Sequence, residues 1–321
     1  MSFNLNFEVV LPVLIAFGIS VMLSPIVIPF LKKLKFGQFV RDDGPESHLK
    51  KSGTPTMGGL IILCSIVGTS LIYMKKYPKI LPILFVTLGF GLIGFLDDYI
   101  KVVMKRSLGL RAWQKMALQI VVTGVFCYYI MTQTDLGTRM LIPFWHGHYL
   151  EVGFWYIPIL FFVVLGTVNG ANFTDGLDGL ASSVTVLIAT FFTVVAIGMK
   201  AGIEPITCAA VGALLGFLVY NVYPARVFMG DTGSLALGGF VAATAYILEM
   251  PLFIPIVALI YLVEVLSVII QVVSFKTTGK RPFKMAPIHH HFELSGWPET
   301  KVVAIFSIVT TVLCLIGLLA L

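Results

Sequence analysis

Long apolar runs recur along the chain and are separated by short polar segments. The runs are too continuous for the amphipathic helices of a water-soluble protein, and their strand-length alternation is too weak for a membrane barrel. A run of roughly 20 apolar residues crosses the hydrocarbon core of a bilayer as a helix, which satisfies its own backbone hydrogen bonds. The pattern predicts ten such helices, at 8–31, 57–74, 80–101, 113–132, 154–170, 178–198, 204–221, 233–249, 251–274 and 302–320. We therefore expect an all-α integral membrane protein in which residues 1–321 form a single domain.

Composition and charge support this fold and give it an orientation. Hydrophobic residues make up 58% of the chain and charged residues only 12%, against about 25% charged in soluble proteins. Placing both termini outside puts 17 of the 22 Lys and Arg residues on the cytoplasmic side, as the positive-inside rule requires. The five left outside are Lys75, Lys76, Lys79, Arg139 and Lys200. The aromatic external loop at 133–153 is interpreted as an interfacial belt with a small hairpin rather than as a ligand site.

A pair of adjacent carboxylates, Asp97 and Asp98, closes the third expected helix at the membrane boundary. Neighbouring carboxylates repel each other unless a cation or a proton lies between them. A solvated helix end is the alternative interpretation, but the pair favours a site that binds a cation or moves a proton. Lys101 and Lys105 continue the same helix and are able to offset the charge.

Two further acidic motifs lie on the same predicted face. Residues 169–180 combine three glycines with Asn and Asp residues before a new helix, where backbone N–H groups can receive phosphate. Asp175 and Asp178 are three residues apart and share a face if the turn is helical; an N-cap role would explain only one of them. In residues 221–234, the turn at Gly230 and Asp231 exposes a carboxylate, although Asp231 could instead cap the next helix. Phe228 is either a stacking residue or an interfacial anchor.

The last predicted cytoplasmic loop contains His289, His290 and His291 close to Lys280, Arg281 and Lys284. Adjacent helical residues point in different directions, so a single metal ion would not take all three histidines. The basic context suits a diphosphate, and the alternative is attraction of the loop to anionic lipid. Glu264 and Gln271 lie within the ninth expected helix; they would line either a transport path or, as we prefer, the deep wall of the same site.

Carboxylates that hold Mg²⁺ and cations that receive phosphate charge, gathered on one membrane face, are typical of metal-assisted phosphoryl transfer. At these residues the chain resembles the polyprenyl-phosphate N-acetylhexosamine-1-phosphate transferases over essentially its whole length. Five motifs occur in order: 50–59, Asp97-Asp98, 172–180, 230–233 and 287–293. The triple histidine followed by Phe292 and Glu293 is similar to the muramoyl-pentapeptide branch of that family.

The resemblance implies specific residue roles. Asp231 would bind the metal, Asp97 would deprotonate the lipid phosphate, and Asp98 and His290 would complete the catalytic group. The implied substrate-binding residues are Lys50, Lys115, Asn172, Asp175, Gly176, Leu177, Asp178, Asn221, Phe228, Gly230, Gln271, His289 and His291. Within this set, Gly176 to Asp178 would bind uracil and Phe228 would stack on it.

The resemblance also implies the reaction: UDP-N-acetylmuramoyl-pentapeptide and undecaprenyl phosphate give lipid I and UMP, with Mg²⁺. It implies a homodimer in the bacterial plasma membrane, and we expect no nucleic-acid partner. The residues allow either direct attack by the lipid phosphate or a two-step route through an aspartyl-phosphate. A related transferase that uses UDP-GlcNAc and a secondary transporter of anions are the alternative functions.

Overall fold

The structure, a computed structural model, describes residues 7–33, 53–104 and 109–321. A long helix corresponds to each of the ten apolar runs. These helices are α1 (Phe7–Lys33), α3 (Gly59–Tyr73), α4 (Ile80–Val102), α5 (Ala112–Gln133), α6 (Tyr156–Thr174), α7 (Leu180–Met199), α8 (Glu204–Asn221), α9 (Gly230–Ile247), α11 (Leu259–Thr278) and α13 (Glu299–Leu319). Eight segments of the described chain are long and apolar enough to cross a membrane; α3, with 15 residues, and α9 fall outside that group. The all-α membrane fold is thus confirmed.

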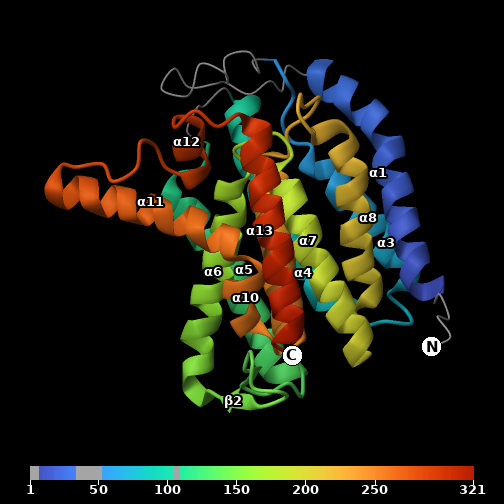
Figure 1. Cartoon of the computed structure of the whole chain (residues 1–321). Coiled ribbons are helices and arrows are strands. Elements are labelled where there is room, and N and C mark those ends of the chain that lie inside the picture. The colour runs from blue at the N-terminus through green and yellow to red at the C-terminus, as the bar shows by residue number, and fades with distance from the viewer. Residues whose placement is uncertain (1–6, 34–52, 105–108) are drawn as a thin grey trace.

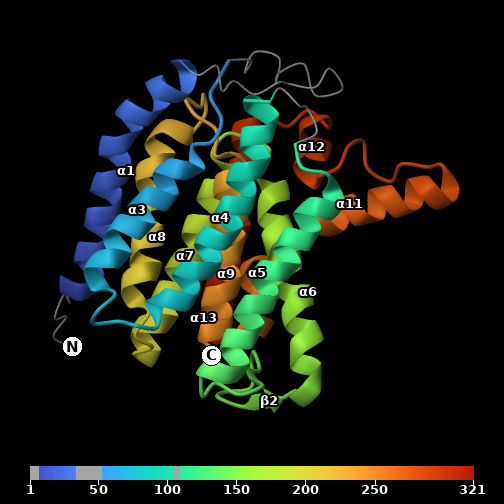
Figure 2. The same ribbon diagram turned by 180° about the vertical axis from the view of Figure 1, so that it is seen from behind.

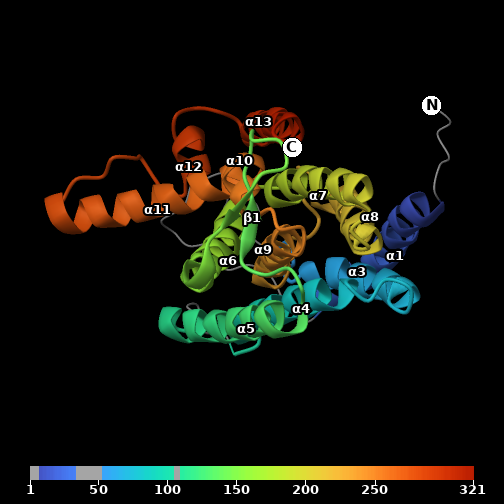
Figure 3. The same ribbon diagram turned by 90° about the horizontal axis from the view of Figure 1, so that it is seen from below.

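Helix α9 is the centre of the molecule. Sixteen of its 18 residues are buried, and it packs against α3, α4, α6 and α7. Figure 3, a view along the bundle, shows α9 enclosed by the other helices. A helix that touches protein rather than lipid needs small residues for close packing more than it needs high hydropathy. This explains why α9 is a short and weakly apolar run in the sequence.

Helices α1 and α8 make a second close contact at the side of the bundle, visible in Figure 2. A Cβ atom added to Gly212 would lie 2.1 Å from the carbonyl oxygen of Val13, so the two backbones touch there. The outer face of α1 is apolar and exposed at Phe7, Met22 and Ile26. An exposed apolar face on a long helix is what contact with lipid requires.

Three boundaries differ from the sequence prediction. Helix α6 continues to Thr174 and α7 begins at Leu180, so the polar connection between them shrinks to 175–179. Helix α9 begins at Gly230, which places Asp231 inside its first turn. The run at 251–274 is not one helix. It divides into η2 (Pro251–Phe253), α10 (Ile254–Val257) and α11. The break between α10 and α11 falls at Ala258, whose backbone angles are not helical (φ −111°, ψ 33°).

The break at Ala258 changes the direction of the chain. Beyond it, α11 leaves the bundle sideways and projects well beyond the other helices (Figure 1). Its buried residues, Ile260, Tyr261, Glu264 and Ser267, all belong to the first half of the helix. The loop after α11 returns to the bundle through a short helix, α12 (Ile288–Glu293), which the sequence did not predict.

The two ends of the bundle differ in chemistry. The start of α1 and the end of α13 lie at one end (Figure 1). The antiparallel hairpin of β1 (Arg139–Leu141) and β2 (Tyr149–Glu151) lies there too and is followed by η1 (Gly153–Trp155). Glu8 forms an ion pair with Lys76 at this end, which neutralises part of the exceptional basic cluster at 75–79. The acidic motifs and α12 lie toward the opposite end.

Candidate active site

Helices α4 and α9 approach each other so closely that their backbones touch. A Cβ atom added to Gly94 would lie 2.0 Å from the carbonyl oxygen of Asp231. A Cβ atom on Gly59 of α3 would lie 2.1 Å from the backbone nitrogen of Gly233. Glycine is required at such contacts because any side chain would separate the helices. This packing brings the end of α4, with its two aspartates, to the first turn of α9.

Asp98 is bound to the N-terminus of α9. Its carboxylate accepts hydrogen bonds from the N–H groups of Asp231 (3.2 Å) and Thr232 (2.9 Å), and from the Thr232 hydroxyl (2.7 Å). The first N–H groups of a helix have no partner within the helix, and a negative charge there is favourable. Asp98 occupies both N–H groups, so they are not open to a phosphate.

Asp97 and Asp231 share two lysines. The Lys101 ammonium lies 2.5 Å from the Asp97 carboxylate and 2.8 Å from that of Asp231. The Lys115 ammonium lies 2.9 Å from Asp231 and 3.8 Å from Asp97. Asp97 also accepts the N–H of Leu110 (2.7 Å). Asp97 is only 3% exposed and Asp231 16%, so Asp231 is the more accessible of the two carboxylates.

Asn172 completes the surroundings of Asp231. From the last turn of α6, its amide donates to Asp231 (2.8 Å) and to the Ser234 hydroxyl (2.9 Å). Its carbonyl oxygen lies 3.4 Å from the Lys115 ammonium. Helices α4, α5, α6 and α9 thus each contribute a polar side chain to one cluster.

The cluster has the charge and the donor atoms for a divalent cation. Three carboxylates, those of Asp97, Asp98 and Asp231, meet only two lysines, Lys101 and Lys115. Burial, and then the charges of Asp231 and Asp98, raise the pKa of the Asp175 carboxyl well above its ordinary value. Among the residues described, no three His, Cys, Asp or Glu side chains form a metal cage of their own. Mg²⁺ normally needs only one or two carboxylates, with water and substrate phosphate completing its shell.

The turn between α6 and α7 is held from three sides. The Asp178 carboxylate accepts the N–H of Ala225 (2.8 Å), and the Asp178 N–H donates to Glu299 of α13 (2.5 Å). Leu177 is buried. A Cβ atom on Gly176 would lie 2.1 Å from the His289 ring nitrogen Nε2. The turn is not helical, so Asp175 and Asp178 do not share a helix face, and their environments differ.

The loop between α8 and α9 is tied down at both of its ends. The Asn221 amide donates to the carbonyl oxygen of Val227 (2.9 Å), and its oxygen accepts from the Ser182 hydroxyl (2.8 Å). Asn221 is therefore engaged by the protein at both ends of its amide. Phe228 is half-buried, and its backbone pairs with Pro55 and Gly58. Gly230 has a left-handed φ of 72°, and a Cβ there would lie 2.7 Å from Asp98.

The three histidines have three different partners. His289 Nδ1 lies 3.0 Å from Glu264, and both side chains are buried. His290 Nδ1 lies 2.7 Å from Glu293. His291 Nδ1 accepts the N–H of Lys284 (3.1 Å). Through His289 and Gly176, the histidine helix α12 lies directly against the turn at 175–178.

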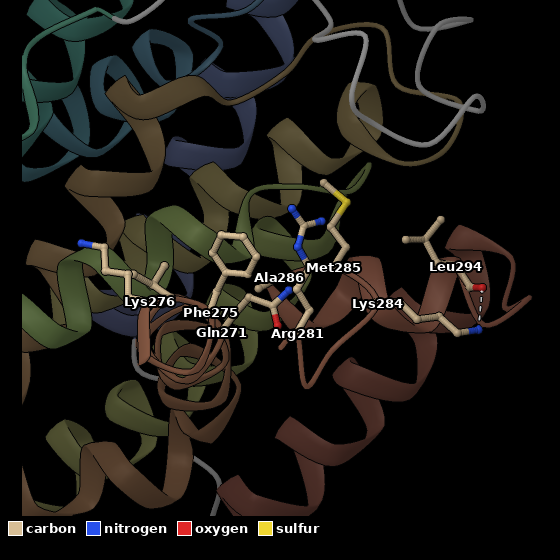
Figure 4. A pocket seen from close by; sticks show the side chains of 9 residues that line it. Gln271, Phe275, Lys276, Arg281, Lys284, Met285, Ala286 and Leu294 are labelled. Atoms are coloured by element: carbon tan, nitrogen blue, oxygen red, sulfur yellow. Dashed lines mark hydrogen bonds between the residues drawn. The ribbon is translucent and has the colours of Figure 1, made fainter. Parts of the chain in front are cut away.

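Gln271 belongs to a separate cavity between α11 and the loop after it. Its amide exchanges two hydrogen bonds, each of 3.1 Å, with the backbone of Phe283. The cavity has a volume of about 410 Å³ and combines Lys276, Arg281 and Lys284 with apolar side chains. Figure 4 shows these residues and the bond from Lys284 to the carbonyl oxygen of Leu294.

The structure thus joins most of the expected site. Asp97, Asp98, Lys115, Asn172, Asp175, Gly230 and Asp231 form one network; Gly176, Leu177, Asp178 and the histidines adjoin it through the 175–178 turn. Lys50 lies outside the described residues. Lys101 was not among the expected binding residues, although its spacing of four from Asp97 on a helix indicated the contact. Nothing in the local sequence indicated that Glu299 binds the 175–178 turn.

Comparison with known proteins gives a consistent family. Residues 80–249 match the family model described as glycosyl transferase family 4, and residues 51–63 match a phospho-N-acetylmuramoyl-pentapeptide-transferase signature. A phospho-N-acetylmuramoyl-pentapeptide-transferase of Clostridium botulinum (strain Alaska E43 / Type E3) is 55% identical, over 99% of this chain and 98% of the relative. The proteins of that name from Clostridium kluyveri (strain ATCC 8527 / DSM 555 / NBRC 12016 / NCIMB 10680 / K1) and Clostridioides difficile (strain 630) are 52% and 51% identical. Each match covers 98% of this chain, and the two matches cover 100% and 98% of the respective relatives. The chain therefore belongs to glycosyl transferase family 4 and, within it, to the phospho-N-acetylmuramoyl-pentapeptide-transferases.

Proposed function

We propose that this protein transfers phospho-N-acetylmuramoyl-pentapeptide from its UDP derivative to undecaprenyl phosphate, giving lipid I and UMP. The observation that carries the proposal is the convergence of Asp97, Asp98 and Asp231 with Lys101 and Lys115 at one end of the helical bundle. Two negatively charged phosphate substrates must meet in this reaction. Cations that already bridge carboxylates supply the charge that such a meeting requires.

Asp231 is the residue best suited to hold Mg²⁺, because its carboxylate is more exposed than those of Asp97 and Asp98 and lies beside Asn172. Bound Mg²⁺ would offset the charge of the diphosphate and of the departing UMP. Lys101 and Lys115, now paired with Asp231, would then be able to turn toward phosphate oxygens. We propose Asp231 as the metal ligand on these grounds.

Asp97 is better placed than Asp98 to receive a proton from the lipid phosphate. Asp98 already accepts three hydrogen bonds from the start of α9, which holds it in a structural position. Asp97 shares Lys101 with Asp231 and so lies beside the proposed phosphate position. Neither carboxylate is more than 3% exposed. This burial favours direct attack by the lipid phosphate over an aspartyl-phosphate intermediate, since a nucleophilic carboxylate must reach the phosphorus.

The turn at Gly176 to Asp178, with Phe228 nearby in the α8–α9 loop, is proposed to bind the uridine. The Asp178 carboxylate holds that loop through the N–H of Ala225, so the two parts of the proposed uridine site are joined (2.8 Å). His290 and His291 of α12 are proposed to face the diphosphate. Gln271 and the basic cavity beside it are proposed to contact the sugar-peptide part of the donor.

A membrane location fits both substrates. The acceptor is an apolar lipid confined to the bilayer, whereas the donor is soluble and polar. We propose a single multi-pass domain in the bacterial plasma membrane, with ten spans, both termini outside and the site at the cytoplasmic boundary. We also propose that the protein acts as a homodimer.

The direct test uses purified protein, undecaprenyl phosphate and Mg²⁺, with UDP-N-acetylmuramoyl-pentapeptide or UDP-GlcNAc as the donor. We expect UMP release with the muramoyl donor only, and loss of release in Asp231→Asn or when Mg²⁺ is chelated. UMP release with UDP-GlcNAc alone would assign a different donor. The absence of release with either donor, with the lipid and both donors verified, would contradict the proposed activity.

A further inference from the structure

A carboxylate buried in the middle of the protein gives α11 a role beyond packing. The Glu264 side chain is fully buried and His289 is 1% exposed, and the Glu264 carboxylate lies 3.0 Å from His289 Nδ1. An ionisable group at this depth is costly unless it has a partner, so its presence calls for a function. The contact connects the base of α11 to α12, which lies 25 residues later in the chain.

Further contacts fix the first half of α11, so the position of the Glu264 carboxylate is fixed as well. Tyr261, almost one turn earlier on the same buried face, hydrogen-bonds to Thr185 of α7 through its hydroxyl. A Cβ atom on Gly170 of α6 would lie 2.6 Å from the carbonyl oxygen of Tyr261, so the two helix backbones are in contact. A carboxylate that orients a histidine does so best when its own position is fixed in this way.

The Glu264 contact determines which ring nitrogen of His289 carries a proton. When Glu264 is ionised, its carboxylate only accepts hydrogen bonds, so Nδ1 of His289 donates. Nε2 then lies on the opposite side of the ring, against Gly176, where a Cβ atom would approach it to 2.1 Å. Within the described part of the chain, His289 Nε2 and Glu264 Oε2 are buried atoms without a hydrogen-bond partner.

His291, two positions after His289, is held in the opposite way. His291 Nδ1 accepts a hydrogen bond from the N–H of Lys284, so its proton must reside on Nε2. The proton on Nδ1 of His289 is therefore a property of the Glu264 contact and not of the histidine run.

We propose that Glu264 is a positioning residue that fixes the orientation and the Nδ1–H tautomer of His289. The oriented imidazole packs against the turn at Gly176 and keeps its unprotonated Nε2 directed at that turn. Nucleoside binding at the turn then depends on a side chain of α11 that does not itself touch the nucleoside. The ligand part of this inference rests on the proposed function; the tautomer part does not.

The tautomer is tested first, on the wild-type protein. Nitrogen NMR of ¹⁵N-histidine-labelled protein in detergent distinguishes protonated from unprotonated ring nitrogens. The protein has six histidines, and the spectrum of His289→Gln identifies the His289 signals. We expect His289 to carry hydrogen on Nδ1 with Nε2 unprotonated. A neutral His289 with its hydrogen on Nε2 would overturn the proposal, and this measurement needs no substituted Glu264.

The second test measures UMP affinity by calorimetry in Glu264→Ala and Glu264→Gln. Removing the carboxylate that orients a metal-bound histidine typically costs about 10–100-fold in metal affinity or activity; we expect a loss of UMP affinity of the same order in Glu264→Ala. Glu264→Gln should recover roughly tenfold of it, because its amide oxygen can accept the same hydrogen bond. Ser267→Ala, one turn further along the same buried face, is the matched control and should bind UMP normally; the Ser267 hydroxyl donates to the Glu264 carbonyl oxygen (2.7 Å).

Two results would overturn the proposal. One is unchanged UMP affinity in Glu264→Ala; the other is an equal loss in Glu264→Gln and Glu264→Ala when both proteins melt like the wild type. Wild-type protein that neither binds UMP nor releases it would instead contradict the proposed function. The NMR result on the His289 tautomer would remain valid in that case.

Discussion

The contact between α4 and α9 yields the sharpest prediction, the effect of Gly94→Ala. Gly94 lies one turn before Asp97 on α4, and its Cα faces the carbonyl of Asp231. The substitution adds a single methyl group and removes no polar side chain of the site. Alanine also favours helix over glycine by about 1 kcal/mol, so the intrinsic helix propensity of α4 rises. Any loss of function must therefore come from displacement of the two helices.

The size of the displacement follows from the distances. The added Cβ would lie 2.0 Å from the Asp231 carbonyl oxygen and 2.3 Å from its carbon, whereas ordinary contact begins near 3.4 Å. The opposing atoms belong to the backbone, so no side-chain rotation relieves the clash. The helices must separate by about 1 Å or more, and a misplacement of about 1 Å can cost on the order of 10²-fold in rate. We expect kcat to fall by roughly that factor.

The assay is UMP release, measured together with the melting temperature in detergent. Gly166→Ala on α6 is the matched control, since a Cβ atom there would have no neighbour within 4 Å. We expect Gly166→Ala to retain wild-type activity and Gly94→Ala to lose it while remaining folded. If Gly94→Ala turned over at the wild-type rate, the close α4–α9 contact would not be what holds the carboxylates together.

Three further predictions concern other parts of the structure. Asp98→Ala leaves three donors at the start of α9 without an acceptor. We expect the free energy of unfolding to fall by about 2–4 kcal/mol and the melting temperature by roughly 5–15 °C, with a smaller decrease of both in Asp98→Asn. An unchanged melting temperature would contradict the structural role of Asp98. Gly212→Ala should separate α1 from α8 at a cost of about 1–3 kcal/mol, whereas Gly18→Ala, with no atom within 4 Å of the new Cβ, should melt normally; equal melting would refute the close contact. Glu299→Ala removes the acceptor of the Asp178 N–H. We expect KM for the UDP donor to rise about tenfold with kcat nearly unchanged. An unaltered KM would show that this contact does not contribute to binding of the donor.

The sequence was sufficient to predict the ten long apolar segments and the type of chemistry. Apolar runs separated by polar turns place the spans because a bilayer demands continuous apolar helices. Acidic residues at such boundaries are rare enough to mark Asp97, Asp98 and Asp231 as members of a site. The pairing of Asp97 with Lys101 also follows from helical spacing alone.

The remainder depended on contacts between distant segments. That α9 is the central helix is not visible in its modest hydropathy, because burial within protein replaces contact with lipid. Asp98 binds Asp231 and Thr232 in the first turn of α9, and these residues lie 133 and 134 positions later in the chain. No local sequence pattern indicates this contact. The division of the 251–274 run at Ala258 escaped prediction because that residue is an ordinary helix former whose backbone is redirected by the packing around it.

The central claim is that this carboxylate and lysine cluster transfers a phosphosugar rather than a sugar. The most direct measurement uses UDP-N-acetylmuramoyl-pentapeptide labelled with ³²P in the phosphate attached to the sugar, incubated with wild-type protein, undecaprenyl phosphate and Mg²⁺. The account predicts that the label moves to the lipid fraction while unlabelled UMP is released, and that Asp231→Asn moves almost none. Label retained in the nucleotide as UDP, or equal transfer by Asp231→Asn, would contradict it.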